Sequence, residues 1–371
     1  MTTLHNINIG AIPKVSVAVV NFNGGPLLAH AIGSVLASTT SVEVFLVDNG
    51  SWDASIARVR QHYSHDRRLR IIENGSNLGF TAASNIALKQ ATGEFVLLLN
   101  PDCIVQPDTL EKMLDAVEPQ ADIGMSGCLL RNHDGTEQAG CRRAVPTPWR
   151  TLVRVSHLNK LFPVHPRFRN FLLNHEPLPN APVTVEAISG AFMLVRRTVM
   201  EQVGLLDEGY FLHCDDLDWC MRFRQLGWKI LFVPQVEAVH YKGVCSRGHP
   251  VFVLWHKHKG MIRFYRKFFR HQYPLPLMGA VVAAVWLRFA ALAAISQVHR
   301  YGRLVNNPSI FWGRFSRKVS TVEVTGEENI EVLPEVPLAQ VSQTLMEHVV
   351  PDSQKLQHVE PRHEQLRRVS G

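Results

Sequence analysis

Three carboxylates gather in one short segment of the chain. Asp215, Asp216 and Asp218 lie in the run CDDLDW, where the pattern predicts the start of a helix. Capping and the helix dipole account for one or two acidic residues at such a place. Adjacent carboxylates also repel each other, which favours the protonated form of one of them and suits it to act as a general base. The segment therefore predicts either a helix start or an acid–base residue, and these residues alone do not decide between the two.

Asp102 and His240 are candidate ligands for a metal ion. Asp102 comes directly after the apolar run Glu94–Asn100, in the sequence Asn100-Pro101-Asp102. A carboxylate just past a buried strand is a natural ligand for a hard divalent cation that also binds phosphates. Pro-Asp is, however, a common turn, and a lone histidine such as His240 is more often structural than a ligand. Neither residue alone predicts a metal site. The prediction depends on the pattern of strands and polar residues around them.

The elements that would position these residues alternate between two patterns in the first hundred residues. Short runs rich in Val, Ile and Leu, typical of buried strands, are separated by stretches with helical spacing. The predicted helices are Pro26–Ala37 and Phe80–Ala91, and the predicted strands are Val15–Asn21, Val42–Asp48, Leu69–Asn74 and Glu94–Asn100. This alternation predicts an α/β fold with a mostly parallel central sheet, flanking helices and right-handed crossovers.

Polar residues end each of the four predicted strands. They are Asn21, Asp48, Asn74 and Asn100. Open parallel sheets bind ligands outside the carboxyl ends of their strands. A single Asn at such a place is ordinary turn chemistry, whereas four polar residues together favour a nucleotide site.

The chain is less regular over residues 131–185, where we expect loops, a helix near Thr151–Phe162 and part of an acceptor site. A second patterned block follows. It predicts the strand Ile188–Arg196, the helices Thr198–Val203 and Asp216–Leu226, and the strands Lys229–Val233 and Glu237–His240.

A basic block occupies the C-terminal part of the chain. The formal net charge is +7, but no Asp or Glu lies between Glu237 and Glu323, and that stretch holds 14 Lys and Arg. It contains Leu275–Ile295, the most hydrophobic segment, which is long enough to cross a bilayer although Arg288 lies inside it. We expect an anionic membrane surface as partner and a helical hairpin in the membrane interface. The alternatives are a spanning helix and a helix docked on the protein core, and nucleic-acid binding is disfavoured by the apolar run.

The chain ends and the cysteines indicate the compartment. Met1–Lys14 has no basic stretch followed by an apolar run, so no secretory signal is expected. The six cysteines form no CxxC pair and no zinc-type spacing, which favours a reduced, cytoplasmic protein. From Ser320 onward the chain is polar and interrupted by Pro, which predicts a flexible tail. We therefore expect a catalytic domain at 1–245, a membrane-associating region at 246–319 and a tail at 320–371.

Taken together, these segments closely resemble the inverting family-two glycosyltransferases, which have the GT-A fold, over roughly Val15 to His240. The matching stretches are VSVAVVNFNGG, VEVFLVDNGSWDAS, ENGSNLGFTAASNIAL, GEFVLLLNPD, SGAFMLVRR and GYFLHCDDLDWCMRFRQLGWKILFVPQVEAVHYKG. Their order and spacing together are highly specific. Within the family the chain is most similar to bacterial rhamnosyltransferases, which build cell-surface polysaccharides, and next to galactofuranosyltransferases.

The resemblance implies a role for each matching residue. Contacts with the nucleotide fall to Asn21, Asp48, Asn49, Asn77, Gly79 and Asn85. Asn100-Pro101-Asp102 stands where the family has its Asp-x-Asp metal motif. Because Asn100 replaces the first Asp, a site for Mg²⁺ or Mn²⁺ depends on Asp102, and His240 completes it. Asp216 matches the catalytic base, and Asp215 beside it would shape the acceptor pocket.

The resemblance also implies the reaction. We expect a sugar, L-rhamnose from dTDP-rhamnose, to move with inversion to a hydroxyl of a lipid-linked or polysaccharide acceptor at the cytoplasmic face of the inner membrane. The alternatives are a galactofuranosyl- or other hexosyltransferase, and an inactive sugar-nucleotide-binding scaffold. Asn100 favours the scaffold, whereas Asp102, Asp216 and His240 oppose it. A dinucleotide-binding oxidoreductase is disfavoured because the turn after the first strand is NFNGG and not GxGxxG. The oligomeric state is left open.

Overall fold

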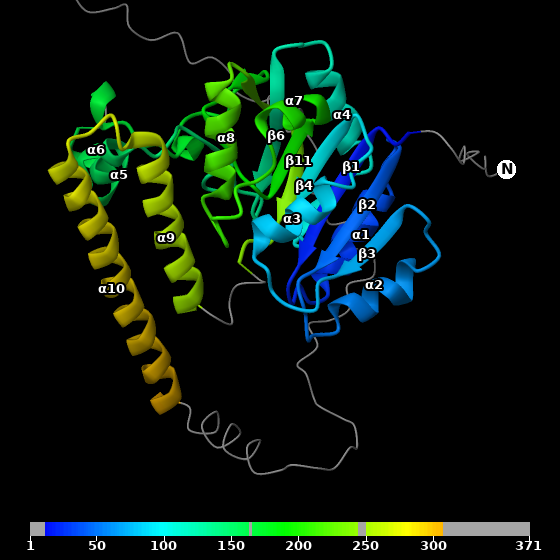
Figure 1. The fold of residues 1–371 in the computed structure, drawn as a ribbon, viewed down its shortest axis with the longest axis horizontal. Helices are drawn as coiled ribbons and strands as arrows, with labels where there is room; N and C mark the ends of the chain where they lie inside the picture. Colours follow the sequence, from blue (N-terminus) through cyan, green and yellow to red (C-terminus); the bar gives the residue numbers. More distant parts are fainter. Residues whose placement is uncertain (1–11, 163–164, 244–249, 307–371) are drawn as a thin grey trace, which may run out of the picture. The chain divides into compact units, whose positions relative to one another are not determined.

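The computed structural model describes residues 12–162, 165–243 and 250–306, so the predicted tail from Ser320 onward lies outside the described residues. Among these residues, a nine-stranded sheet forms the centre, and helices cover both of its faces (Figure 1). The strands lie in the order β3-β2-β1-β4-β10-β6-β11-β5, with β8 paired to β11.

The first half of the sheet is parallel, as predicted. It consists of β1 (Val15–Asn21), β2 (Val42–Asp48), β3 (Leu69–Glu73) and β4 (Phe95–Leu99), connected through α1 (Leu27–Leu36), α2 (Ser55–Tyr63) and α3 (Phe80–Leu88). Asn21 and Asp48 are register partners at the ends of β1 and β2. The predicted polar edge of the sheet is therefore formed by neighbouring strands.

The second half makes the sheet mixed. β10 (Phe192–Arg196) runs antiparallel to β4 and β6 (Ile123–Arg131), while β11 (Lys229–His240) runs parallel to β6 and antiparallel to β5 (Cys103–Val105). The other elements here are α4 (Thr109–Val117), α7 (Arg197–Val203), α8 (Asp215–Gln225), β8 (Val183–Thr184) and a small sheet of β7 (Arg142–Arg143) and β9 (Ala187–Ile188).

Two apolar layers hold the helices on the sheet. α1, α2 and α4 pack on one face, and α3, α7 and α8 pack on the other. Alternate residues of β1 serve both layers, since Val17 and Val19 face the first and Ala18 and Val20 face the second. Burial on both faces explains why these strands are near-continuous apolar runs in the sequence.

Four predicted elements differ in the structure. The helix expected at Thr151–Phe162 is two helices, α5 (Pro148–Val155) and α6 (Leu158–Leu161), because His157 between them has a left-handed φ of 57°. The strand expected at Ile188–Arg196 is interrupted between β9 and β10. The strands expected at Lys229–Val233 and Glu237–His240 form the single strand β11, with a register shift between Val233 and Glu237. Two short 3₁₀ helices, Pro166–Phe168 and Leu173–His175, complete the irregular region.

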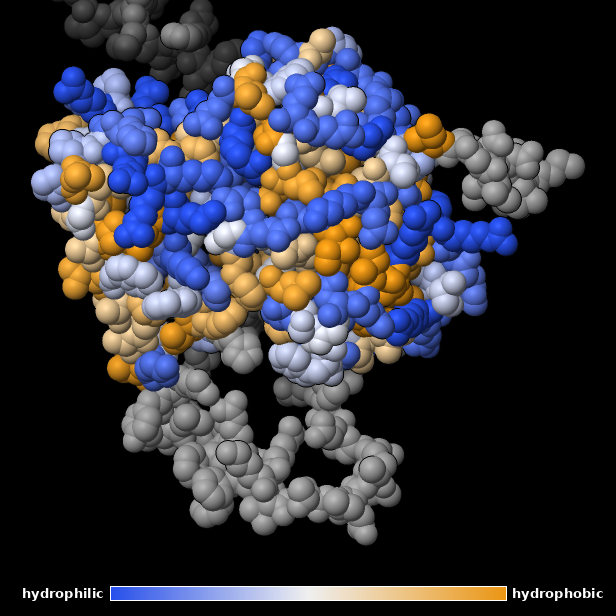
Figure 2. Space-filling view, viewed as in Figure 1, coloured by the Kyte–Doolittle hydropathy of each residue, from blue (hydrophilic) through white to orange (hydrophobic). Residues whose placement is uncertain are grey.

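A helical hairpin follows β11. α9 (Pro250–Phe269) is anchored on the sheet domain, because Phe264 and Tyr265 are fully buried in the same apolar layer as α8. α10 (Leu275–Asn306) packs along α9 (Figure 1). Its segment Leu275–Val298 has a mean hydropathy of 2.0 and could cross a membrane by length and composition, with only 6% of the window buried. α10 is therefore not a core helix, and apolar side chains lie along its outer side (Figure 2).

Candidate active site

A dense hydrogen-bond network closes the edge of the sheet at β1 and β2. The Asn21 amide, which is fully buried, donates from Nδ2 to Asp48 Oδ1, Ser51 Oγ and Ser55 Oγ, each at 2.9 Å. Its Oδ1 accepts from Gly24 N at 3.1 Å. Ser51 donates from its backbone N and its hydroxyl to the Asp48 carboxylate at 3.0 and 2.6 Å. Asn21 therefore positions Asp48 and the loops around it, and its own contact with a nucleotide stays a prediction.

Asn49 holds the next loop. Its Nδ2 donates to Asn77 Oδ1 and Gly79 O at 3.1 Å each, and its Oδ1 accepts from Asn74 Nδ2 at 2.9 Å. Gly79 has a φ of +89°, and a Cβ there would lie 2.8 Å from the ring and 2.9 Å from the carbonyl oxygen of Phe211. Glycine is required for both reasons. The structure thus brings Asn49, Asn77 and Gly79 together beside Asp48.

Asn85 makes its hydrogen bonds elsewhere. On α3 its Nδ2 donates to Leu206 O and Glu208 Oε1 at 2.9 Å each, and its Oδ1 accepts from Leu206 N at 3.1 Å. These bonds tie α3 to the loop that precedes α8. Asn85 therefore has a positioning role in the structure, and its predicted nucleotide contact is not among these bonds.

Asp102 and His240 lie face to face. Pairing of β11 with β5 makes His240 the partner of Cys103, and His240 Nε2 lies 3.1 Å from Asp102 Oδ1. Asn100 Nδ2 lies 3.2 Å from the same ring nitrogen. Asp102 and His240 are only 4% and 6% exposed. The structure therefore joins two residues that lie far apart in the sequence into one polar pair.

Gln138 fixes the orientation of the His240 ring. Its Nε2 donates to Asn132 Oδ1 at 3.0 Å and to His240 O at 3.1 Å, which leaves Oε1 as the atom that lies 2.6 Å from His240 Nδ1. An amide oxygen only accepts, so Nδ1 carries a proton. In the neutral ring the lone pair of Nε2 then points toward Asp102, which is the tautomer a metal ligand needs.

This pair fits a divalent cation that arrives with a phosphate ligand. Among the described residues, no group of three or more His, Cys, Asp or Glu is arranged to hold a metal ion. The protein would therefore supply two ligands, Asp102 Oδ1 and His240 Nε2. Mg²⁺ sites of this kind use one or two protein ligands and fill the other positions with substrate phosphates and water.

Asp216 lies in the first turn of α8 and faces the start of β10. Its Oδ2 accepts from Gly190 N at 3.2 Å and pairs with Arg143 Nη2, and its Oδ1 accepts from Leu217 N at 2.8 Å. A Cβ on Gly190 would lie 3.2 Å from Asp216 Cβ, so glycine gives the carboxylate room. The Asp216 side chain is 18% exposed, whereas Asp215 and Asp218 are buried. Asp216 is therefore the acid of this segment that a substrate can reach.

Asp215 differs from its neighbour in environment. Burial first, and then the negative charge of Asp216, raise the pKa of Asp215 to about 7. Asp218 is instead held in ion pairs with Arg222 and Lys267, at 2.7 and 2.6 Å. The three acids predicted from the sequence thus divide into one half-buried carboxylate that keeps some exposed surface, one protonatable neighbour and one structural residue.

A strained turn sets the direction of Asp216. His213 and Cys214 both have a φ of 67°, and each left-handed residue of this kind costs about 1–3 kcal/mol. α9 braces the turn, because the Cys214 thiol lies 3.9 Å from Lys257 O and a Cβ on Gly260 would lie 2.9 Å from His213 O. Strain that the surroundings maintain in this way is typical of functional sites.

The start of β10 connects the Asp102–His240 pair with Asp216. Asn100 N donates to Ala191 O at 3.0 Å, and the preceding residue, Gly190, donates to Asp216. The segment SGA between β9 and β10 therefore lies between the two polar sites. They form one site at one edge of the sheet.

The chain matches the family described as glycosyl transferase family 2 over residues 16–204, about half of its length. The chain belongs to this family. It is therefore a glycosyltransferase, and its mixed sheet with flanking helices agrees with the GT-A fold expected from the sequence. Asp102 lies within the matched segment, and Asp216 and His240 lie beyond it.

The glycosyltransferase is similar to characterised relatives. It is 30% identical over 261 residues to the N-acetylglucosaminyl-diphospho-decaprenol L-rhamnosyltransferase of Mycobacterium tuberculosis, covering 67% of this chain and 82% of that protein. It is 28% identical over 199 residues to the rhamnosyltransferase WbbL of Escherichia coli, covering 50% and 68%. Among solved structures it is similar to the mannosyltransferase PcManGT of Pyrobaculum calidifontis in complex with GDP-Man and Mn²⁺, at 19% identity over 81% of this chain and 83% of that one, with a TM-score of 0.48.

Two residues of the glycosyltransferase site escaped sequence reasoning. Gln138 and Arg143 both lie in the irregular region 131–185, where no motif marks them. Arg143 Nη2 also donates to Ile188 O at 3.1 Å, and its Nε is buried without a partner among the described residues. The sequence offers one indication only, which is that residues 131–185 are expected to form part of an acceptor site.

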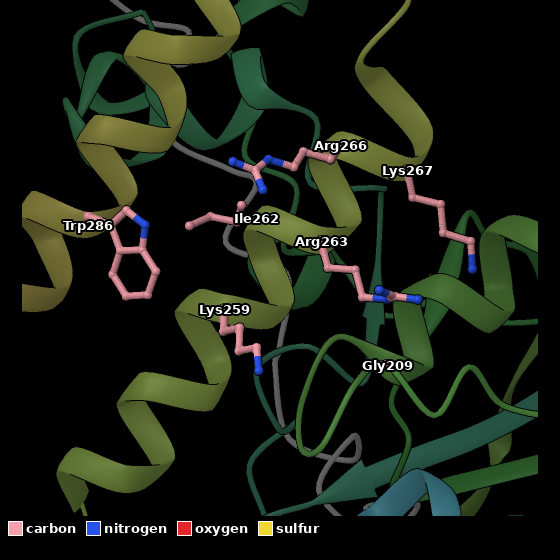
Figure 3. Close-up of a pocket in the computed structure, with 7 residues that line it drawn as sticks. All are labelled: Gly209, Lys259, Ile262, Arg263, Arg266, Lys267 and Trp286. Carbon is pink, nitrogen blue, oxygen red and sulfur yellow. The ribbon is translucent and has the colours of Figure 1, made fainter.

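A separate pocket of the glycosyltransferase lies between α9, α10 and the loop at Gly209 (Figure 3). Its volume is about 520 Å³, and it is lined by Gly209, Lys259, Ile262, Arg263, Arg266, Lys267 and Trp286. Arg263 and Lys267 point toward the Gly209 side and pair with Asp207. The pocket belongs to the hairpin, and none of the site residues named above lines it.

Proposed function

We propose that the glycosyltransferase moves L-rhamnose from dTDP-rhamnose to a hydroxyl group of a lipid-linked glycan in cell-surface glycan synthesis. The two rhamnosyltransferases among its relatives support the sugar. The name of the mycobacterial relative supports an acceptor whose sugar is joined to a polyprenol through a diphosphate.

One observation carries this proposal. The Asp102–His240 pair and the half-buried Asp216 carboxylate lie on either side of the SGA segment. A sugar transfer needs a site for the donor diphosphate and a base for the acceptor hydroxyl within reach of one anomeric carbon. The arrangement at the start of β10 supports this division of roles.

The donor side uses the edge of the parallel strands. Asp48 and Asn49 would face the base and ribose, held in place by Asn21 and Asn77. Asp102 and His240 would hold a divalent cation, Mg²⁺ or Mn²⁺. When bound, such a cation neutralises the donor diphosphate and stabilises the leaving group, a contribution of several kcal/mol.

On the acceptor side, Asp216 takes the proton of the acceptor hydroxyl while that oxygen attacks the anomeric carbon. Attack opposite the leaving nucleotide inverts the anomeric centre. Arg143 and Gly190 N hold Asp216 Oδ2, so the carboxylate is oriented before the acceptor binds. A positioned base of this kind contributes about 10²- to 10⁴-fold to the rate.

The hairpin attaches the enzyme to the cytoplasmic face of the membrane. The outer side of α10 exposes Leu275, Leu287 and Ile295, and the basic residues of α9 and α10 suit an anionic lipid surface.

Because α9 is anchored in the core, the informative variant is Leu277→Glu with Leu287→Glu, which leaves α9 intact. Sedimentation with phosphatidylglycerol vesicles should fall in this variant, and unchanged sedimentation would exclude α10 as the attachment site.

The function is tested with a panel of nucleotide sugars, with Mg²⁺ or Mn²⁺ and with chelator, using membrane extract as the source of acceptor. We expect metal-dependent turnover of dTDP-rhamnose that is lost in Asp102→Ala. Turnover of a different donor would show that the transferred sugar is the one in that donor and not rhamnose. Binding of a donor without turnover of any would indicate the inactive scaffold.

A further inference from the structure

Three cations from three different helices meet without an acidic partner. They are Arg154 of α5, Lys257 of α9 and Arg288 of α10. Among the described residues, none of them takes part in an ion pair. Arg154 lies over the ring of Phe171 at 5.1 Å, and Arg288 Nη1 lies 3.4 Å from His258 Nε2. Lys257 and Arg288 are exposed and Arg154 is half-buried, so the three cations have solvent and no carboxylate beside them among the described residues.

The contacts between the helices bring these cations together. Tyr265 OH donates to Thr151 Oγ1 at 2.7 Å, which fixes α5 against α9. Arg154 follows Thr151 by one helical turn and so lies on the same face of α5. Arg288 contacts His258, the residue after Lys257.

The charges of these residues also influence one another. Desolvation first, and then the charges of Arg288, Arg154 and Arg143, lower the pKa of Lys257. Desolvation and the charge of Arg288 also lower the pKa of Arg154. Lys257 and Arg288 nevertheless keep exposed surface, as residues in the wall of a recess do. The cluster therefore leaves a repulsion among like charges that a bound anion would remove.

The cluster lies between the catalytic turn and the apolar helix. Lys257 O contacts the Cys214 thiol, two residues before Asp216, and the charge of Arg143, the partner of Asp216, is felt at Lys257. On the other side, Arg288 is part of the apolar segment Leu275–Val298. The cations therefore lie between the Asp216 carboxylate on one side and the exposed apolar surface of α10 on the other.

We infer that Arg154, Lys257 and Arg288 bind the diphosphate of the lipid-linked acceptor. The acceptor has three parts in the matching order, which are a sugar hydroxyl, a diphosphate with about two negative charges and an apolar chain. Its sugar lies at Asp216, its diphosphate at the cation cluster and its chain along α10. Arginine forks and a lysine are well suited to diphosphate oxygens. This inference rests on the proposed function, because it assigns the acceptor of that reaction.

Binding of farnesyl diphosphate, a diphosphate on a short apolar chain, tests the inference by titration calorimetry with the full-length protein. The variants are Lys257→Gln, Arg288→Gln and the charge-retaining Arg288→Lys. Lys259→Gln is the matched control, since Lys259 is an exposed cation on the same helix that lines the pocket of Figure 3. We expect Kd to rise roughly tenfold or more in each Gln variant, to recover largely in Arg288→Lys and to change less than about twofold in Lys259→Gln.

Three comparisons separate the sources of this effect. Inorganic diphosphate should compete with farnesyl diphosphate, and sulfate at the same ionic strength should not, because the cluster recognises a diphosphate and not anions in general. The Kd of the nucleotide-sugar donor should stay unchanged in Lys257→Gln and Arg288→Gln. An equal loss in Lys259→Gln, equal competition by sulfate or a loss of donor binding would each overturn the inference. Metal-dependent donor turnover by the wild-type enzyme would then still support the proposed function, whereas its absence would refute that function independently.

Discussion

The two sides of the active site differ in how their polar groups are satisfied. At the donor side, Asn21 and Asn49 are buried and make several hydrogen bonds each to neighbouring loops. On the proposed acceptor side, Lys257 and Arg288 have no ion-pair partner among the described residues, and Arg288 belongs to an apolar helix with little burial. The donor side is therefore held by internal hydrogen bonds before any ligand binds, whereas the proposed acceptor side leaves like charges facing solvent.

The largest expected effect is that of Asp216→Asn on catalysis. If Asp216 is the base that joins the two sides, kcat should fall by about 10²- to 10⁴-fold, while the Kd of the donor stays unchanged. Steady-state kinetics and donor titration measure the two quantities. Glu201→Gln, which changes an exposed acid on α7, is the control. Full activity of a correctly folded Asp216→Asn protein would remove this residue from the mechanism.

Asn21 is fully hydrogen-bonded and Lys257 has no ion-pair partner among the described residues, so substitutions at the two positions should affect stability in opposite directions. Asn21→Ala removes the buried amide that donates to Asp48, Ser51 and Ser55 and leaves Gly24 N without its acceptor, so the free energy of unfolding should fall by about 2–4 kcal/mol. Lys257→Gln removes one charge from a cluster of like charges, and it should leave the stability unchanged or raise it. Denaturant unfolding of both variants measures the difference. A large loss of stability in Lys257→Gln would contradict the view of an unsatisfied acceptor side.

Gln138→Ala tests how the His240 ring is oriented. Without the acceptor at Nδ1, the tautomer with its lone pair toward Asp102 is no longer selected, and Mn²⁺ affinity should fall by about 10- to 100-fold. Electron paramagnetic resonance of free Mn²⁺ measures this change without reference to activity. Gln120→Ala, which alters an exposed amide on the surface, should leave the affinity unchanged. An unchanged affinity in Gln138→Ala would separate His240 from metal binding.

The smallest expected effect is a pH-dependent one at Asp215. Burial and then the charge of Asp216 raise its pKa from an ordinary value of 3.8 to about 7 in the folded protein. The folded state therefore binds the proton more tightly than the unfolded state, and the charged carboxylate destabilises the protein as the pH rises from about 4 to 7. Asp215→Asn should raise Tm by a few degrees at pH 8 and have little effect at pH 4. A larger gain at pH 4 than at pH 8 would show that the sign is wrong.

The sequence predicted the donor side better than the acceptor side, for a physical reason. Strands such as Val15–Asn21 and Val42–Asp48 are buried on both faces, so their apolar runs gave their bounds directly. The pairing of Asp102 with His240 followed only from the resemblance, because no local pattern shows that β11 lies against β5. Local spacing alone does not reveal long-range strand pairing.

The acceptor side depends on contacts without a local signature. The ion pair of Arg143 with Asp216 joins an irregular region to α8 across 73 residues. The cluster of Arg154, Lys257 and Arg288 depends on how three helices pack. The basic block was visible in the sequence, but composition did not show which of its 14 Lys and Arg converge near Asp216.

The most direct test of the central claim is the anomeric configuration of the product. Nuclear magnetic resonance of the glycan formed from dTDP-rhamnose and a lipid-diphosphate acceptor determines it. Single displacement with Asp216 as base predicts a product whose anomeric configuration is opposite to that of the donor. A product that keeps the donor configuration would contradict this mechanism and the role of Asp216 within it.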